Sequence, residues 1–182
     1  MTMLKKETMN YILLRGYCYL QMLNNPRSAL RQFMKLEQML DEGKDSSEHA
    51  EYSEFGMLEI RCMLGAAIAY QRLDMFNEAL TALRMSLDKL QFSIMYFSSD
   101  ECFAHHKNQH LNTLLKLSIM IFVNMSRILE RSGHILFSEL AARIATYNVE
   151  DSMDFIQDRE FYQVIHVFYN FIQQKVGVES PC

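Results

Sequence analysis

The stretch Met63–Leu87, MLGAAIAYQRLDMFNEALTALRMSL, indicates the fold of the whole chain. Apolar residues recur at helical spacing on both sides of Leu73–Phe76, which predicts two helices joined by a tight turn. Small side chains, Ala66 and Ala67 before the turn and Ala79 after it, fall where the two helices would cross. Because helix axes come close only where side chains are small, we expect an antiparallel helical hairpin here.

The rest of the chain is also free to be helical, since 182 residues contain only two prolines and six glycines. Pro26 separates two predicted helices, because a proline disfavours helix at the residue before it but is tolerated at the first helical position. Capping-box patterns at 45–48 and 98–101 begin later helices, and Gly133 ends one. The predicted helices span 3–23, 26–43, 47–73 (irregular before Glu54), 76–96, 98–131, 136–147 and 150–175.

Three predicted helical pairs share a weak internal repeat, which is typical of a stacked array. The first helix of each pair, here called the leading helix, carries a small residue and then a larger one. The second, or trailing, helix carries another small residue and another larger one. These positions are Gly16, Tyr19, Ala29 and Phe33 in the first pair and Ala67, Tyr70, Ala79 and Leu83 in the second. The third pair follows the pattern more faintly, with Ser126 and Leu129 and then the small residues Ser138, Ala142 and Ala145.

This order of small and large residues resembles the tetratricopeptide repeat, most specifically in Met63–Leu87 and more loosely elsewhere between Asn10 and Tyr147. Two features depart from that family. Its usual tryptophan is replaced by Ile12, Met63 and Phe122, and the small residues of the trailing helices at 29, 79 and 138 give periods of 50 and 59 residues. The family period is about 34 residues, so longer helices or linkers are expected.

The resemblance implies an all-α fold in which antiparallel hairpins stack as a short right-handed superhelix. We expect a single domain over residues 1–182, with hairpins at 3–43, 47–96 and 98–148 and a C-terminal capping helix at 150–176.

The resemblance also implies that the leading helices line a concave groove for a partner helix or peptide. The expected groove residues are Asn10, Leu13, Tyr17, Gln21, Arg61, Leu64, Ile68, Arg72 and Arg127. Chaperone-binding members of the family hold a carboxylate with lysines and asparagines, whereas three of the matching slots here are Leu13, Tyr17 and Leu64. The alternative is that these apolar residues pack inside the array.

The last predicted helix is a second candidate surface, because it is apolar nearly all round. Its candidate contact residues are Phe161, Ile165, Phe168 and Ile172. Two interpretations stay open: the helix folds back as a cap of the array, or it binds a partner chain and forms a homo- or hetero-oligomer.

A small helical metal-binding protein is the alternative function. Cys102, His106 and His110 follow one another at spacings of four, which puts one thiol and two imidazoles on one helix face. Lys107 stands where helical zinc proteases have their general-base glutamate, and no fourth ligand is evident. A solvated helix start explains the same residues.

Composition narrows the remaining function classes. The net charge of −4 argues against nucleic acid, and the longest apolar run is too short to cross a bilayer. Four cysteines without a Cys-x-x-Cys pair, together with fourteen methionines, favour the reducing cytoplasm or nucleus. No phosphate-binding loop or nucleophile elbow is present. The sequence therefore predicts a non-catalytic adaptor or scaffold subunit that binds a protein or peptide and needs no cofactor.

Overall fold

The computed structural model describes residues 3–42, 52–98 and 104–150, and these residues form α-helices and no strand. The all-α prediction is confirmed for this part of the chain. The helices are α1 (Met3–Gln21), α2 (Pro26–Asp41), α3 (Tyr52–Arg72), α4 (Phe76–Ser98), α5 (Ala104–Arg131) and α6 (Ile135–Glu150). The predicted capping boxes at 45–48 and 98–101, apart from Ser98, and nearly all of the predicted last helix lie outside the described residues.

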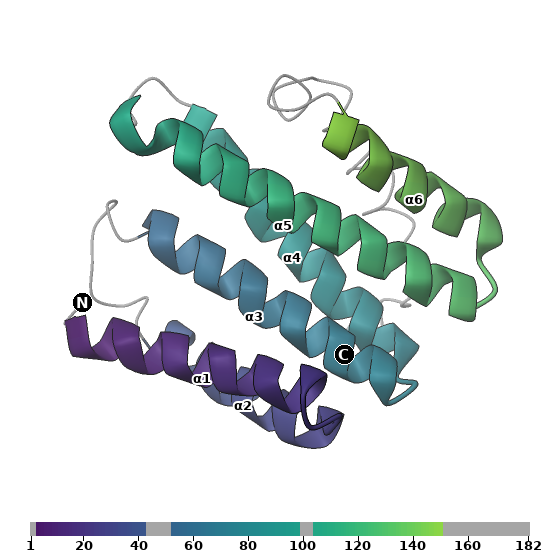
Figure 1. Ribbon diagram of the computed structural model, residues 1–182, viewed down its shortest axis with the longest axis horizontal. Coiled ribbons are helices and arrows are strands. Elements are labelled where there is room, and N and C mark those ends of the chain that lie inside the picture. The colour runs from purple at the N-terminus through teal and green to yellow at the C-terminus, as the bar shows by residue number, and fades with distance from the viewer. Residues whose placement is uncertain (1–2, 43–51, 99–103, 151–182) are drawn as a thin grey trace, which may run out of the picture.

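The helices pack in the order of the sequence. Each contacts the next one along the chain, and α3 additionally contacts both α1 and α5. In Figure 1 the leading helices α1, α3 and α5 follow one another across the front, with α2 and α4 behind them and α6 beside α5. Three hairpins, α1–α2, α3–α4 and α5–α6, therefore lie side by side, with α3 in the middle.

The turns inside the hairpins explain where the helices end. Two of them are Schellman motifs: the Met75 N–H donates to the Tyr70 carbonyl at 3.0 Å, and the His134 N–H to the Leu129 carbonyl at 2.8 Å. Each has a residue with positive φ after the helix, Asp74 at 59° and Gly133 at 82°. In the first turn Asn24 has a positive φ of 44°. The hydrogen bond that closes this turn spans one more residue, from the Asn25 N–H to the Tyr19 carbonyl.

The small residues of the predicted repeat occupy equivalent places in the three hairpins. The backbone N–H groups of Ala29, Ala79 and Ser138 each donate to the carbonyl of the residue just before their helix, four positions earlier. All three are buried. In the third hairpin the hydroxyls of Ser126 and Ser138 lie 3.1 Å apart across the helix crossing. Small residues therefore do lie where the paired helices meet, as the sequence predicted.

Glycines allow the closest approach between hairpins. Phe33 of α2 lies between Gly16 of α1 and Gly65 of α3, and a Cβ built on either glycine would lie 2.6 or 2.4 Å from the Phe33 ring. Tyr17 packs edge-on against the same ring, with 5.4 Å between ring centroids. Gly16 was predicted as a crossing residue, whereas the role of Gly65 was not.

Two hydrophobic cores share α3. Leu58, Cys62 and Ala69 of α3 join the core of the first hairpin. Ile60, Leu64 and Ala67, on other sides of the same helix, join the larger core formed by α3, α4, α5 and α6. The middle helix therefore connects two packing units that otherwise touch little.

Candidate partner-binding surfaces

The residues predicted to form a groove along the leading helices fall into two groups in the structure. Leu13 and Leu64 are buried in the two cores, so a partner cannot reach their side chains without rearranging the helices. The structure thus favours the packing alternative for these two residues. The polar members, by contrast, are exposed: Asn10, Gln21, Arg61, Arg72 and Arg127. Tyr17 and Ile68 are half-buried.

Two of the predicted groove residues instead hold helices together. The Arg72 guanidinium donates to the Leu20 carbonyl at the end of α1 and to the Asn24 side chain at 3.3 Å. The Tyr17 hydroxyl donates to the Arg61 carbonyl at 2.9 Å, and burial raises the pKa of Tyr17. Both contacts join α1 to α3, and a cation is favourable at the carbonyl end of a helix. These two side chains therefore have structural roles.

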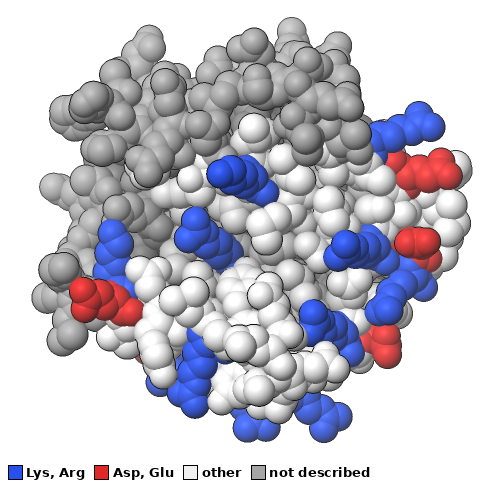
Figure 2. Space-filling view, viewed as in Figure 1, with Lys and Arg blue, Asp and Glu red and all other residues white. Residues whose placement is uncertain are grey.

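The side of the molecule formed by the leading helices, here called the leading-helix face, is basic. Its exposed cations include Arg61 and Arg72 on α3 and Lys116 and Arg127 on α5. Figure 2 shows Lys and Arg side chains spread across this side, with Asp and Glu near its edges. The net charge of the whole protein, −4, does not reveal this basic face.

A concave feature of the described residues lies on the other side of α3, between α2 and α4. This α2–α4 groove has a volume of about 370 Å³ and is partly open to solvent. Its lining residues come from three helices: Leu30, Phe33, Met34 and Glu37 of α2, Cys62, Met63, Ala66 and Tyr70 of α3, and Asn77, Glu78, Thr81, Ala82 and Met85 of α4. A smaller pocket of about 130 Å³ continues it past Leu40, Asp41, Glu59 and Lys89.

The groove is apolar at its base and acidic along its sides. Burial, aided by the charges of Glu37 and Glu59, raises the pKa of the Cys62 thiol to about 12. Burial and the charges of Glu37 and Glu78 likewise raise the pKa of Tyr70. One cation offsets this field in part, since Lys89 forms an ion pair of 2.9 Å with Glu59.

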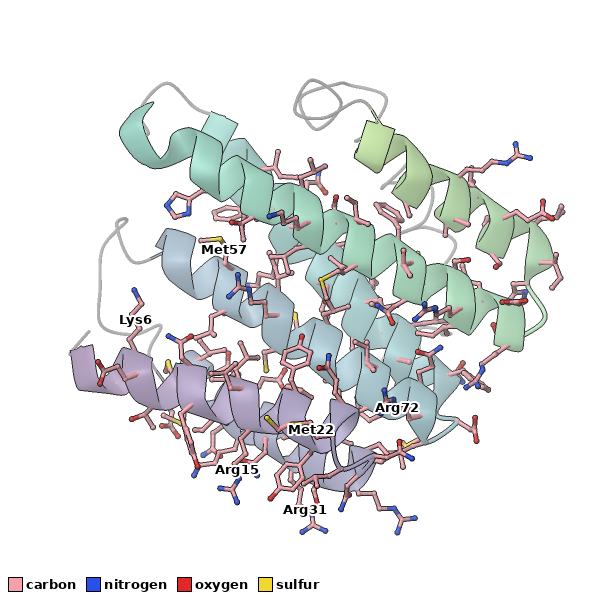
Figure 3. All side chains as sticks on the ribbon, viewed as in Figure 1. Lys6, Arg15, Met22, Arg31, Met57 and Arg72 are labelled. Atoms are coloured by element: carbon pink, nitrogen blue, oxygen red, sulfur yellow. The ribbon has the colours of Figure 1, made fainter. Side chains whose placement is uncertain are left out.

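Helical spacing separates the groove from the basic face. Met57, Arg61, Ile68 and Arg72 lie on one side of α3, whereas Cys62, Met63, Ala66 and Tyr70 lie on the opposite side. Figure 3 shows Met57 and Arg72 on the side of the leading helices. Leu64, predicted to line a groove, lies in the core instead, and the α2–α4 groove was not predicted from the sequence. The sequence signal that could have indicated this groove is three methionines, Met34, Met63 and Met85, on helix faces next to small residues.

The candidate metal ligands are only partly described. Cys102 and the side chain of His106 lie outside the described part of the structure, and His110 is half-buried near the start of α5. Within 3–42, 52–98 and 104–150, no cluster of three or more His, Cys, Asp or Glu residues could hold a metal ion. The candidate residues of the predicted last helix, Phe161, Ile165, Phe168 and Ile172, also lie outside the described ranges.

No family model, curated protein or solved structure matches this chain. The chemistry of its surfaces is therefore the guide to what it binds. Of the helices that the structure describes, none is both long enough and apolar enough to cross a bilayer. Two buried polar side chains bond within their own helices: Ser86 donates to the Ala82 carbonyl at 2.9 Å and Asn124 to the Met120 carbonyl at 2.7 Å. Such bonds satisfy buried polar groups inside a helix.

Proposed function

We propose that this protein is a non-catalytic protein-binding module, a stack of helical hairpins of the tetratricopeptide-repeat type that acts as an adaptor or as a subunit of a larger assembly. Sequential packing of α1–α2, α3–α4 and α5–α6, with small residues at equivalent crossings, supports this type of architecture. A right-handed superhelical course of the stack is part of the proposal.

The α2–α4 groove is the observation that supports a binding function most strongly. Binding sites are typically concave, mostly apolar and largely preformed, with a few polar groups that fix orientation. The groove has all of these properties, because its apolar base is held by the packed core and Glu37 and Glu78 stand at its sides. Exposed methionines such as Met34, which is 55% exposed, are adaptable contact residues.

Differential capture from the native source tests this function. The full chain, carrying an affinity tag, is compared with Met34→Glu and Met85→Glu, which place a charge in the groove at exposed positions. Met22→Glu, at an exposed position directly after α1, is the matched control. Circular dichroism verifies that all variants are folded.

We expect at least one protein to co-purify with the wild type and the Met22→Glu control and to be lost from both groove variants. Capture that is the same for all four chains would contradict the assignment to the groove. A fifth chain, Phe168→Glu, distinguishes the predicted last helix as the contact surface, because it alone would then lose the partner.

A further inference from the structure

Resting on the proposed function, we infer that the α2–α4 groove binds an amphipathic α-helix of a partner protein, with an apolar face in the groove and lysine or arginine side chains along its edges. Three properties of the groove support this: its shape and lining, the hydrogen bonding of its walls, and its charge.

The walls of the groove favour a helix over an extended peptide. All three lining segments are α-helices, whose backbone N–H and C=O groups bond within the same helix except at the ends. An extended peptide would lose water from its own backbone groups and find no backbone partner in such walls. A helix satisfies its backbone internally and needs only an apolar surface to bury, which is the helix-in-groove mode of recognition.

The dimensions fit about three helical turns. The groove and its continuation follow α2 from Leu30 to Asp41. At 1.5 Å per residue this is a length of about 16 Å, so apolar side chains at positions i, i+4, i+7 and i+11 of a bound helix would span it. The small side chains of Ala66 and Ala82 leave room at the base, and Met34, Met63 and Met85 can adjust to the shape of the inserted side chains.

The charge of the groove selects a basic helix. Glu37, Asp41 and Glu78 are exposed along its sides. Burial is the main cause of the raised pKa of Tyr70 and Cys62, and the charge of the nearby Glu37 adds to it in both. The protein's own residues 151–176 carry four carboxylates, one arginine and one lysine, so their net charge of −2 has the wrong sign for this groove. Electrostatic complementarity therefore points to a cationic segment of another chain.

Methionine methyl NMR on the full-length chain tests this inference with defined probes. Met34, Met63 and Met85 report on the groove. Met22, exposed directly after α1, and Met120, exposed on α5, report on other surfaces. The probes are two synthetic 16-residue helical peptides with leucines at i, i+4, i+7 and i+11. One carries lysines along its edges and the other carries glutamates at the same positions.

We expect the lysine peptide to shift the methyl signals of Met34, Met63 and Met85, to leave those of Met22 and Met120 in place, and to bind more weakly as salt rises. The double variant Glu37→Gln/Glu78→Gln should weaken its binding roughly threefold to tenfold, as expected for two exposed ion pairs. The matched control, Glu130→Gln/Glu139→Gln, removes two exposed carboxylates of α5 and α6 and should leave the affinity unchanged.

The possible failures are distinguishable. If both peptides shift the groove signals with equal affinity and the double variant has no effect, the charge selection is wrong while the binding groove stands. If neither peptide shifts them, the groove assignment and the inference both fail. If a synthetic peptide of residues 151–176 displaces the lysine peptide at equal affinity, the occupant is the chain's own last segment and the assignment to a partner is overturned.

Discussion

Phe33 lies between Gly16 and Gly65, and this contact sets how closely α1, α2 and α3 approach one another. In an ordinary helix, replacing glycine with alanine stabilises the protein by roughly 0.5–1 kcal/mol. At Gly65 the added methyl group would lie 2.4 Å from the Phe33 ring, so either the ring or the helix must move. Overpacking of this kind costs about 1–3 kcal/mol.

We therefore predict that Gly65→Ala lowers the free energy of unfolding, measured by urea denaturation. Phe33→Leu should destabilise the wild type through a cavity but destabilise Gly65→Ala much less, because the smaller side chain makes room for the new methyl group. If the changes in the free energy of unfolding from Gly65→Ala and Phe33→Leu were additive, the close contact between Gly65 and the Phe33 ring would be contradicted.

Cys62 gives a prediction for the pH dependence of stability. Its thiol is buried, donates to the Phe33 carbonyl at 3.2 Å and has a pKa of about 12, against 9.0 for an unperturbed thiol. The unfolded chain loses this proton near pH 9, whereas the folded chain keeps it. The stabilisation is therefore complete below pH 9 and is lost as pH rises toward 12, by at most about 1.4 kcal/mol per pH unit.

Denaturation at pH 8, 9 and 10 checks this prediction. We expect the free energy of unfolding to fall between pH 9 and 10 in the wild type and to fall less in Cys62→Ala. The raised pKa of Tyr17 leaves a residual slope in both proteins. Equal slopes of stability against pH in the two proteins would show that the fold does not raise the pKa of Cys62.

Thiol labelling gives a second check of the burial of Cys62. Below pH 9 a thiol reagent should label the exposed Cys18 quickly and Cys62 only through opening of the structure.

At the scale of single elements, the turns were the most predictable part of the chain. Asn-Asn-Pro at 24–26 and Gly133 are local signals, and the structure ends helices at both. The helix faces were also predictable, because the small residues at 29, 79 and 138 are buried as expected. The α2–α4 groove was not, because its width depends on how far α3 separates two helices that are remote in sequence. Leu13 and Leu64 were assigned to a groove through the family resemblance, whereas the structure buries both in the cores.

The two Schellman turns predict opposite effects of substitution. Asp74 adopts a φ of 59°, which costs a side chain roughly 1 kcal/mol, so Asp74→Gly should stabilise the protein or leave it unchanged. Gly133 adopts a φ of 82°, and a Cβ built on it would meet no other part of the structure within 4 Å. Gly133→Ala should therefore destabilise the protein by about 1 kcal/mol through the backbone alone. Thermal unfolding of both variants checks these signs. A loss of stability in Asp74→Gly equal to that in Gly133→Ala would show that the aspartate side chain, and not its backbone conformation, governs that turn.

At the scale of the whole molecule, sequential packing predicts unequal stability along the chain. Proteins built from stacked hairpins can open one unit while the others stay folded. Gly16→Val should push Phe33 out of the first core and unfold α1 and α2, with little effect on α5 and α6, which share no core residue with them. Leu64→Ala, in the shared helix α3, should weaken both units.

Native-state hydrogen exchange measures this difference directly. In Gly16→Val we expect amides of α1 and α2 to lose protection while those of α5 and α6 keep it. A uniform loss of protection in all helices would mean that the chain folds as one cooperative unit.

The opposite sides of α3 carry opposite charge, with Arg61 and Arg72 on one and Glu37 and Glu78 flanking the other. A molecule polarised in this way has a dipole moment across its thickness. In the field of a charged partner it would rotate before contact, so that encounters begin with the correct side already turned toward the incoming surface.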